Sequence, residues 1–298
     1  MKIIVNSKYI LYGGKTMKEK TILITGAGSG LGKLTALTLA KLGHSVIATT
    51  ETERHAQILR KDAEALKLTL RIEQLDITIE SDRRKAWAWD IDILVNNAGV
   101  SEGGSLIDIP EENLRNQFEV NVIGTTLLTQ GFARQMVRKK DGRIIFVSSI
   151  SGLMANAFSG AYVSSKFALE GVASTLSQEL MEHNVEVATI NPGPYLTGFN
   201  DEEHERYRTW PTSPEENIFN PIKLSFPLKQ YEAKSAVAPI IRVILGKTKK
   251  YRNVIPRRLI PVVLSMQKFE WIRKTNWFLG KRHLMAQKSM DMEPATRK

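Results

Sequence analysis

The chain has 298 residues, a formal net charge of +11 and no cysteine. This length is enough to bury a core, and it fits one large α/β domain or two small ones. Because cysteine is absent, disulfides, thiolate nucleophiles and cysteine-ligated metals are excluded, and we expect no metal site. The sequence lacks the apolar run of about 18 residues that a membrane-spanning helix needs, and its start lacks a secretory signal. We therefore expect a cytoplasmic protein.

The positive charge is concentrated at the two ends of the chain. Residues 246–298 contain 14 Lys and Arg against 3 Asp and Glu, whereas residues 21–245 contain 23 basic and 27 acidic residues. The middle of the chain therefore offers no electrostatic reason to expect nucleic acid as a partner.

Apolar runs of strand length alternate with longer segments of helical spacing. Continuous apolar strands that alternate with helices indicate a parallel sheet covered on both faces. Since crossovers between parallel strands are right-handed, we expect an α/β fold with a Rossmann-type doubly wound sheet. The predicted strands are 21–25, 45–49, 69–75, 91–96, 143–148 and 186–190, and the predicted helices include 32–42 and 112–138.

The same pattern divides the chain into one main domain and two extensions. Residues 1–16 precede the first motif and are either a flexible extension or a stretch ahead of the natural start. Residues 17–245 form the main domain, which ends in a predicted helix over 233–245, and residues 246–298 form a basic helical extension. Within the domain, the stretch 200–230 is polar, aromatic and rich in proline. So long an irregular insertion is usually functional or disordered.

A glycine-rich segment, Thr25-Gly-Ala-Gly-Ser-Gly-Leu-Gly32, follows the first predicted strand and opens a helix. Glycines let the backbone turn tightly and approach a pyrophosphate, and the helix N-terminus supplies free N–H groups and a partial positive charge. The alternative is a plain strand-to-helix turn, but the placement favours dinucleotide binding. The residues that we expect to contact the dinucleotide are Gly26, Ser29, Gly30, Leu31 and Gly32.

The ends of the next strands carry polar residues that suit the rest of a dinucleotide. Glu51 can accept hydrogen bonds from ribose hydroxyls and would repel a 2′-phosphate. Because the first basic residue beyond it is Arg54, we favour NAD over NADP. Asp76 could accept from the adenine amino group or cap a helix. The fourth strand ends in a crevice wall beside the cofactor, or in a simple turn, made of Asn97, Ala98 and Gly99.

The second half of the predicted domain contains four residues that together suggest proton-transfer chemistry. Tyr162 and Lys166 are four positions apart, so on a helix they share one face. An ammonium group near a phenol lowers the phenol pKa, which proton transfer at neutral pH requires. Ser149, at a predicted strand end, could hold a substrate oxygen, although serine there is commonly a cap. Asn121 lies within a predicted helix despite its poor helix propensity, which favours a special role such as anchoring a water near the lysine.

Taken in chain order, these motifs resemble the short-chain dehydrogenase/reductase family over about residues 17–245. The resemblance implies an NAD(P)-dependent oxidoreductase that transfers hydride between the nicotinamide ring and an alcohol or ketone. The matching motifs are Thr-Gly-x-x-x-Gly-x-Gly at 25–32, Asn-Asn-Ala-Gly at 96–99, Asn121, Ser149, Tyr-x-x-x-Lys at 162–166, and Pro192-Gly193 with Thr197.

The resemblance also implies a role for each matching residue. Tyr162 would exchange a proton with the substrate oxygen and lie against the cofactor. Ser149 would orient that oxygen, and Asn121 would support a water-linked proton relay. Lys166 would also bind the hydroxyls of the nicotinamide ribose. The nicotinamide carboxamide would be positioned by Pro192, Gly193 and Thr197.

The chain departs from the family pattern in three places. Tyr195 stands where the family usually has Val or Ile, and we expect it to contact the substrate. The short segment between Asp76 and Asn96 suggests a trimmed helix that would affect a dimer face, although we still expect a homo-oligomer. The extension 246–298 exceeds the family's minimal core.

The variable segments suggest a substrate class and a membrane contact. Apolar side chains in 200–230 could form a lid over a hydrophobic alcohol or ketone, the alternative being a loop packed on its own aromatics. Basic residues of the tail interleave with Trp, Phe and Leu, which fits either peripheral contact with an anionic membrane or a helix packed on protein. The lid candidates are Tyr207, Trp210, Ile218, Phe219 and Phe226.

Two other functions fit parts of the sequence. A catalytically idle dinucleotide sensor could dispense with Tyr162 and Lys166, so the presence of both argues against it. A membrane-surface interaction protein, in which the tail dominates, would lose lipid binding without the tail and keep any turnover.

Overall fold

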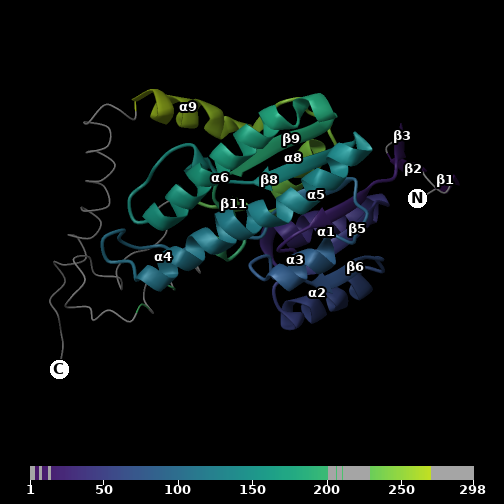
Figure 1. The fold of residues 1–298 in the computed structure, drawn as a ribbon, viewed down its shortest axis with the longest axis horizontal. Coiled ribbons are helices and arrows are strands. Elements are labelled where there is room, and N and C mark those ends of the chain that lie inside the picture. Colours follow the sequence, from purple (N-terminus) through teal and green to yellow (C-terminus); the bar gives the residue numbers. More distant parts are fainter. Residues whose placement is uncertain are drawn as a thin grey trace.

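The computed structural model describes residues 4–6, 9–12, 15–200, 206, 210 and 229–269. Of the predicted lid residues, only Trp210 is among them, and the tail beyond residue 269 lies outside them. Figure 1 shows a twisted central sheet with helices on both faces.

The central sheet is parallel throughout and contains seven strands. From β4 the chain first builds outward through β5 and β6, then returns to β7 on the other side of β4. This reversal makes a crevice at the carboxyl ends of β4 and β7, where doubly wound sheets bind ligands. The strands in spatial order are β12 (Arg252–Ile255), β9 (Val185–Pro192), β8 (Gly142–Val147), β7 (Ile93–Asn96), β4 (Thr21–Ile24), β5 (Ser45–Thr50) and β6 (Arg71–Gln74).

Two apolar layers hold the helices against the sheet. Successive residues of β4 point to opposite layers: Ile22 and Ile24 join one and Leu23 joins the other. Both faces are therefore dry, which is why these strands are apolar without alternation. The first layer holds α1 (Gly30–Leu42), α2 (Glu53–Ala65) and α8 (Lys234–Ile244); the second holds α3 (Glu80–Ala86), α5 (Thr125–Lys139) and α6 (Gly160–Glu179). The predicted doubly wound Rossmann-type fold is confirmed.

The predicted helix 112–138 is interrupted by a wider turn. It consists of α4 (Glu111–Phe118), a π-helical segment (Glu119–Gly124) and α5. Gly124 lets the wider turn pack against the backbone at Ile77, because a Cβ on Gly124 would come within 2.8 Å of the Ile77 carbonyl oxygen. Such π-segments occur frequently at functional sites.

The sheet continues beyond residue 245, which the sequence did not indicate. Strand β12 lies in the segment predicted as a helical extension, and its Asn253 is in register with Ile190 of β9. The strand is short and half polar, so its pattern resembled a loop. Helix α9 (Ile260–Phe269) follows and packs through Val263 against Leu153 and Val254.

The N-terminal segment also has structure of its own. Strands β1 (Ile4–Asn6), β2 (Tyr9–Tyr12) and β3 (Lys15–Lys18) form an antiparallel sheet separate from the central one. The remaining elements are the short parallel pair β10 (Tyr195–Leu196) and β11 (Tyr231–Glu232) and the 3-10 turns at Ile150–Gly152, Met181–His183 and Arg257–Leu259.

His44 links the stability of this core to pH. It is buried between α1 and β5, where its Nδ1 accepts a hydrogen bond from the Lys20 backbone N–H at 3.3 Å. Burial, helped by the charge of Lys247, lowers the pKa of His44 from 6.5 to about 4. The histidine is therefore neutral in the folded protein, and protons bind preferentially to the unfolded chain between these two values.

We predict that the free energy of unfolding falls by about 2 kcal/mol between pH 7 and pH 5 because of His44. The stabilisation is fully present above the unfolded pKa and is lost as the pH falls toward the folded one. His44→Asn, which keeps an acceptor for Lys20, should remove most of this dependence in urea unfolding at both pH values. The exposed His183, changed to Asn, is the control; equal pH dependence in both variants would contradict the prediction.

Candidate active site

The glycine-rich segment forms a tight loop between β4 and α1 at the crevice. Gly26 has φ +64°, and a Cβ there would lie 2.7 Å from the Cα of Ala98. Gly30 has φ +54° and lies against Thr197, whose Cβ would be 3.3 Å from a Cβ on the glycine. Only glycine fits such a backbone at such contact. The structure thus brings the predicted phosphate loop, Ala98 and Thr197 together, with Ser29 and Leu31 at the start of α1.

Asn97 and Ala98 brace this loop from the end of β7. The Asn97 side chain donates to the carbonyl oxygens of Thr25 (2.9 Å) and Gly26 (3.0 Å). The backbone N–H groups of Asn97 and Ala98 both donate to the Thr25 hydroxyl at 3.0 Å. A Cβ on Gly32 would lie 2.4 Å from the Asn97 Nδ2, so this glycine makes room for the brace. The sequence analysis missed Thr25, whose position between a strand and a glycine was the available signal.

Glu51 and Asp76 occupy different surroundings at the ends of β5 and β6. The Glu51 side chain is exposed. The backbone carbonyl of Glu51 accepts a hydrogen bond from the Gln74 side-chain amide at 3.1 Å. The Asp76 carboxylate accepts from the backbone N–H and hydroxyl of Thr78, at 2.8 and 2.7 Å. Asp76 therefore stabilises the turn that precedes α3, a role similar to the helix cap considered in the sequence analysis. Its contact with adenine stays a prediction.

Tyr162 and Lys166 lie one turn apart near the start of α6, as predicted. The Lys166 Nζ is 5.6 Å from the centroid of the Tyr162 ring and donates to the Val147 carbonyl at 3.1 Å. The lysine is 4% exposed, and this burial lowers its pKa from 10.5 to about 8, against the opposing charge of Glu170. The tyrosine ring also makes an edge-type contact with the ring of Phe199, at 5.7 Å between centroids.

Ser149 follows β8 and begins the turn Ile150–Gly152. Its hydroxyl accepts from the Ser151 N–H at 3.0 Å, so it has the capping role weighed above, and the side chain is largely buried. An acceptor bond leaves the hydroxyl proton available for a further partner. Its backbone carbonyl accepts from the Asn191 amide at 3.2 Å.

Asn121 lies in the π-helical segment and is fully tied into its surroundings. Its side chain accepts from the Val100 N–H at 2.8 Å and donates to the Val100 carbonyl at 2.9 Å and the Ser165 hydroxyl at 3.0 Å. A Cβ on Gly99 would lie 3.1 Å from the Asn121 Oδ1 and 3.6 Å from the Lys166 Nζ. Gly99, Asn121 and Lys166 therefore meet at one point. Ser165 and Gln117, which donates to Val100 at 2.8 Å, were missed by the sequence analysis.

The residues after β9 divide between the crevice and the core. The Gly193 N–H donates to the Ile255 carbonyl at 2.7 Å, and the side chain of Leu259 covers the glycine. Pro192 ends β9, and Thr197 faces the glycine loop as described. Tyr195 packs its ring 5.7 Å from Tyr231, is 3% exposed and has its pKa raised to about 12 by burial. Tyr195 therefore lies in the apolar core, and its substrate contact stays a prediction.

A buried carboxylate receives the predicted substrate loop. Glu102 is 4% exposed and accepts from Arg206 at 3.1 Å, from the Trp210 indole at 3.4 Å and from the Asn113 amide at 3.1 Å. The Trp210 ring packs against Ile109 and Phe158. Glu102 was missed because its two loop partners lie more than a hundred positions away in the sequence.

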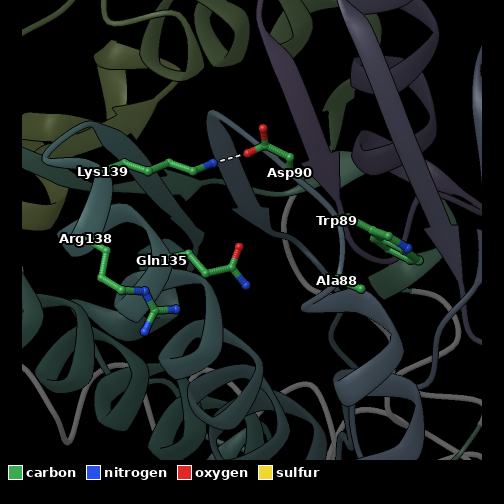
Figure 2. A pocket seen from close by; sticks show the side chains of 6 residues that line it. All are labelled: Ala88, Trp89, Asp90, Gln135, Arg138 and Lys139. Carbon is green, nitrogen blue, oxygen red and sulfur yellow. Dashed lines mark hydrogen bonds and ion pairs between the residues drawn. The ribbon is translucent and has the colours of Figure 1, made fainter.

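A separate hollow of about 300 Å³ lies at the opposite, amino-terminal edge of the sheet, beside the starts of β7 and β8 (Figure 2). Lys139 points across it and forms an ion pair with Asp90. The lining residues are Ala88, Trp89, Asp90, Gln135, Arg138 and Lys139. None of the predicted site residues is among them.

The described part of the chain offers neither a membrane span nor a metal cluster. Within it, no helix is both long and apolar enough to cross a membrane, and no cluster of three or more His, Asp or Glu could hold a metal ion. The part of the predicted membrane-contact tail beyond residue 269 lies outside those residues.

Comparisons with known proteins agree with the fold and the motifs. Residues 20–208 match the family model described as short chain dehydrogenase. An uncharacterized oxidoreductase of Bacillus subtilis is 41% identical over 189 residues, covering 61% of this chain and 67% of that protein. The 3-ketodihydrosphingosine reductase of Bacteroides thetaiotaomicron is 35% identical, covering 62% of this chain and 67% of that protein. Human retinol dehydrogenase 8 is 34% identical, covering 60% of each.

Solved structures share the fold. A short-chain dehydrogenase/reductase from Burkholderia phymatum, crystallised in complex with NAD, superposes with a TM-score of 0.73 at 22% identity. The match covers 84% of this chain and 94% of that one. With the family model, the relatives and the fold in agreement, the chain belongs to the short-chain dehydrogenase/reductase family of oxidoreductases.

Proposed function

We propose that this protein is an NAD(P)-dependent dehydrogenase or reductase of a hydrophobic alcohol/ketone pair, with Tyr162 as the acid/base. The observation that carries the proposal is the meeting of Gly99, Asn121 and Lys166 beside the tyrosine, at the same sheet edge as the glycine loop. Phosphate binding and proton transfer would thus occur within one crevice.

The residues at the crevice fit a dinucleotide. The loop glycines leave a cradle that side chains would fill, and the first turn of α1 carries no acidic residue to repel a pyrophosphate. In the proposal, Gly26, Ser29, Gly30, Leu31 and Gly32 hold the phosphates, and Glu51 the adenosine ribose. The nicotinamide side is assigned to Gly99, Lys166, Pro192, Gly193 and Thr197. When bound, the cofactor supplies or accepts the hydride.

The protein's own contribution is proton delivery and orientation. Tyr162 gives a proton to the substrate oxygen during reduction and takes it back during oxidation. The Lys166 ammonium stabilises the phenolate form of Tyr162. Although burial lowers the lysine pKa to about 8, this value is still above neutral pH, so the amine is mostly charged. Ser149 holds the substrate oxygen through its hydroxyl. Asn121 supports a water-linked relay from the lysine.

Apolar surface near Tyr162 supports a hydrophobic substrate. Leu106 is 56% exposed and packs beside Gly160, two residues before the tyrosine, and its neighbour Ile107 is 68% exposed. Phe199 lies against the tyrosine ring itself. Two of the relatives are named as a 3-ketodihydrosphingosine reductase and a retinol dehydrogenase, and these names are consistent with an apolar substrate.

Glu102 would act on the substrate side by anchoring the segment 200–230. Its carboxylate is buried while Arg206 is partly exposed, so the ion pair holds Arg206 to the body of the protein. Trp210 adds an apolar contact on the same anchor. A segment held at two points can form one wall of a substrate pocket.

The first test is Tyr162→Phe, with a panel of hydrophobic alcohols and ketones followed by nicotinamide absorbance with both cofactors. Loss of the phenol hydroxyl should lower kcat by about 10² to 10⁴-fold, because the proton has no other donor at that place. Cofactor affinity, measured by fluorescence titration, should stay unchanged. Equal turnover in the variant would contradict the acid/base role. Cofactor binding without turnover in the parent would instead favour the idle sensor.

The second test concerns cofactor choice. Glu51→Arg should shift preference toward NADPH by about tenfold, or about 1.4 kcal/mol, because an arginine pairs with the 2′-phosphate that the glutamate repels. The ratio of kcat/KM for the two cofactors measures the shift. Glu53→Arg, two positions along at the start of α2, is the control. An unchanged ratio in Glu51→Arg would remove Glu51 from the ribose site.

The third test concerns the loop anchor. Glu102→Gln keeps acceptors for Trp210 and Asn113 but removes the charge that pairs with Arg206, so KM for a hydrophobic ketone should rise by about tenfold. Cofactor affinity should not change. Glu111→Gln, which breaks an exposed ion pair with Arg115, should leave both constants unchanged. A KM unaltered in Glu102→Gln would contradict the anchoring role.

A further inference from the structure

Glu170 is a buried carboxylate one helical turn beyond Lys166 on α6. It is 5% exposed. Arg252 of β12 donates to its Oε2 through two nitrogens, at 3.1 and 3.0 Å. A buried carboxylate is costly unless it is paired and hydrogen-bonded, and this two-pronged ion pair satisfies it.

The other oxygen of Glu170 leads to the turn that carries Ser149. Asn191, at the end of β9, donates to the Glu170 Oε1 at 2.6 Å and to the Ser149 carbonyl at 3.2 Å. Its own side-chain oxygen accepts from the Thr189 hydroxyl at 3.0 Å, which fixes the amide orientation. One buried amide therefore joins helix α6 to the backbone of Ser149.

The same turn lies directly on α6 between Lys166 and Glu170. A Cβ on Gly152 would come within 2.8 Å of the Ser148 hydroxyl, 2.9 Å of the Lys166 carbonyl and 3.2 Å of the Glu170 side chain. The turn and the helix are thus in backbone contact, and a small change in the Glu170 side chain would be felt at Ser149. Because of this contact, the ion pair between Glu170 and Arg252 can affect the position of the turn that begins at Ser149.

We propose that Glu170, held by Arg252 and acting through Asn191, is a positioning residue that sets Ser149 against Tyr162 and Lys166. Strand β12 then has a part in the active site, because it delivers the arginine from the edge of the sheet. The inference rests on the proposed function, in which Ser149 orients the substrate oxygen.

Hydrogen exchange tests the geometry without any substrate. The turn's amides donate within it: Ser151 to the Ser149 hydroxyl, Gly152 to the Ser149 carbonyl and Leu153 to the Ile150 carbonyl. In Glu170→Gln and Arg252→Gln, a peptide spanning 148–154 should exchange about tenfold faster, with no change at 25–32. Arg84→Gln, which breaks an exposed ion pair with Glu80, is the control. Unchanged exchange at 148–154 would overturn the proposal.

Kinetics then separates positioning from general structural support. With a ketone turned over by the parent, Glu170→Gln should lower kcat by about tenfold and leave the cofactor Kd within about twofold. Arg252→Lys, which keeps the charge, should retain most of the activity. In a Ser149→Ala background, Glu170→Gln should lower kcat by less than about twofold, because both changes remove the same contact.

The outcomes distinguish this inference from the proposed function. An equal loss from Glu170→Gln in both backgrounds would show that Glu170 acts independently of Ser149, and would overturn the inference. Full turnover in Ser149→Ala or Tyr162→Phe would instead overturn the proposed function, while faster exchange at 148–154 would still place Glu170 as the support of the turn.

Discussion

The burial of one ammonium group organises the centre of this molecule. Lys166 is almost inaccessible to solvent, and a charge in such a place destabilises the fold unless its neighbours compensate for lost water. The Val147 carbonyl accepts one of its hydrogens, and the charge of Glu170 opposes the effect of burial. These contacts require the end of β8 and the face of α6 to lie together. The turn that begins at Ser149 follows β8, and its Gly152 lies against the Lys166 carbonyl of α6.

A second group of buried amides surrounds that charge. Asn121 and Gln117 both bond to Val100 and to the Ser165 hydroxyl, and Ser165 in turn donates to the Tyr162 carbonyl at 2.8 Å. Fully satisfied polar networks of this kind are rigid. The π-helical segment serves the network, because its wider turn carries Asn121 against Val100 and Ser165. The irregular turn of the helix and the hydrogen bonds of Asn121 therefore occur at the same place.

Two ion pairs link variable parts of the chain to this centre. Glu102 receives Arg206 from the segment after β10, and Glu170 receives Arg252 from β12. In each pair the carboxylate is buried and the arginine is more exposed, so a buried negative charge is neutralised by an arginine near the surface. Each ion pair therefore joins a residue from late in the chain to a buried carboxylate of the preceding fold.

Local pattern was sufficient for six of the seven strands of the central sheet, the glycine loop and the helical pairing of Tyr162 with Lys166. Apolar runs, glycine placement and four-residue spacing are properties of neighbouring residues. They can therefore be recognised in the sequence without knowledge of the fold. The brace from Asn97 to Thr25, the core position of Tyr195, the strand β12 and the acceptors Glu102 and Glu170 were not foreseeable in this way. Each depends on partners tens to about a hundred positions distant, and only packing decides which distant residues become neighbours. Sequence determined the chemistry available to this protein; tertiary structure decided which side chains support it.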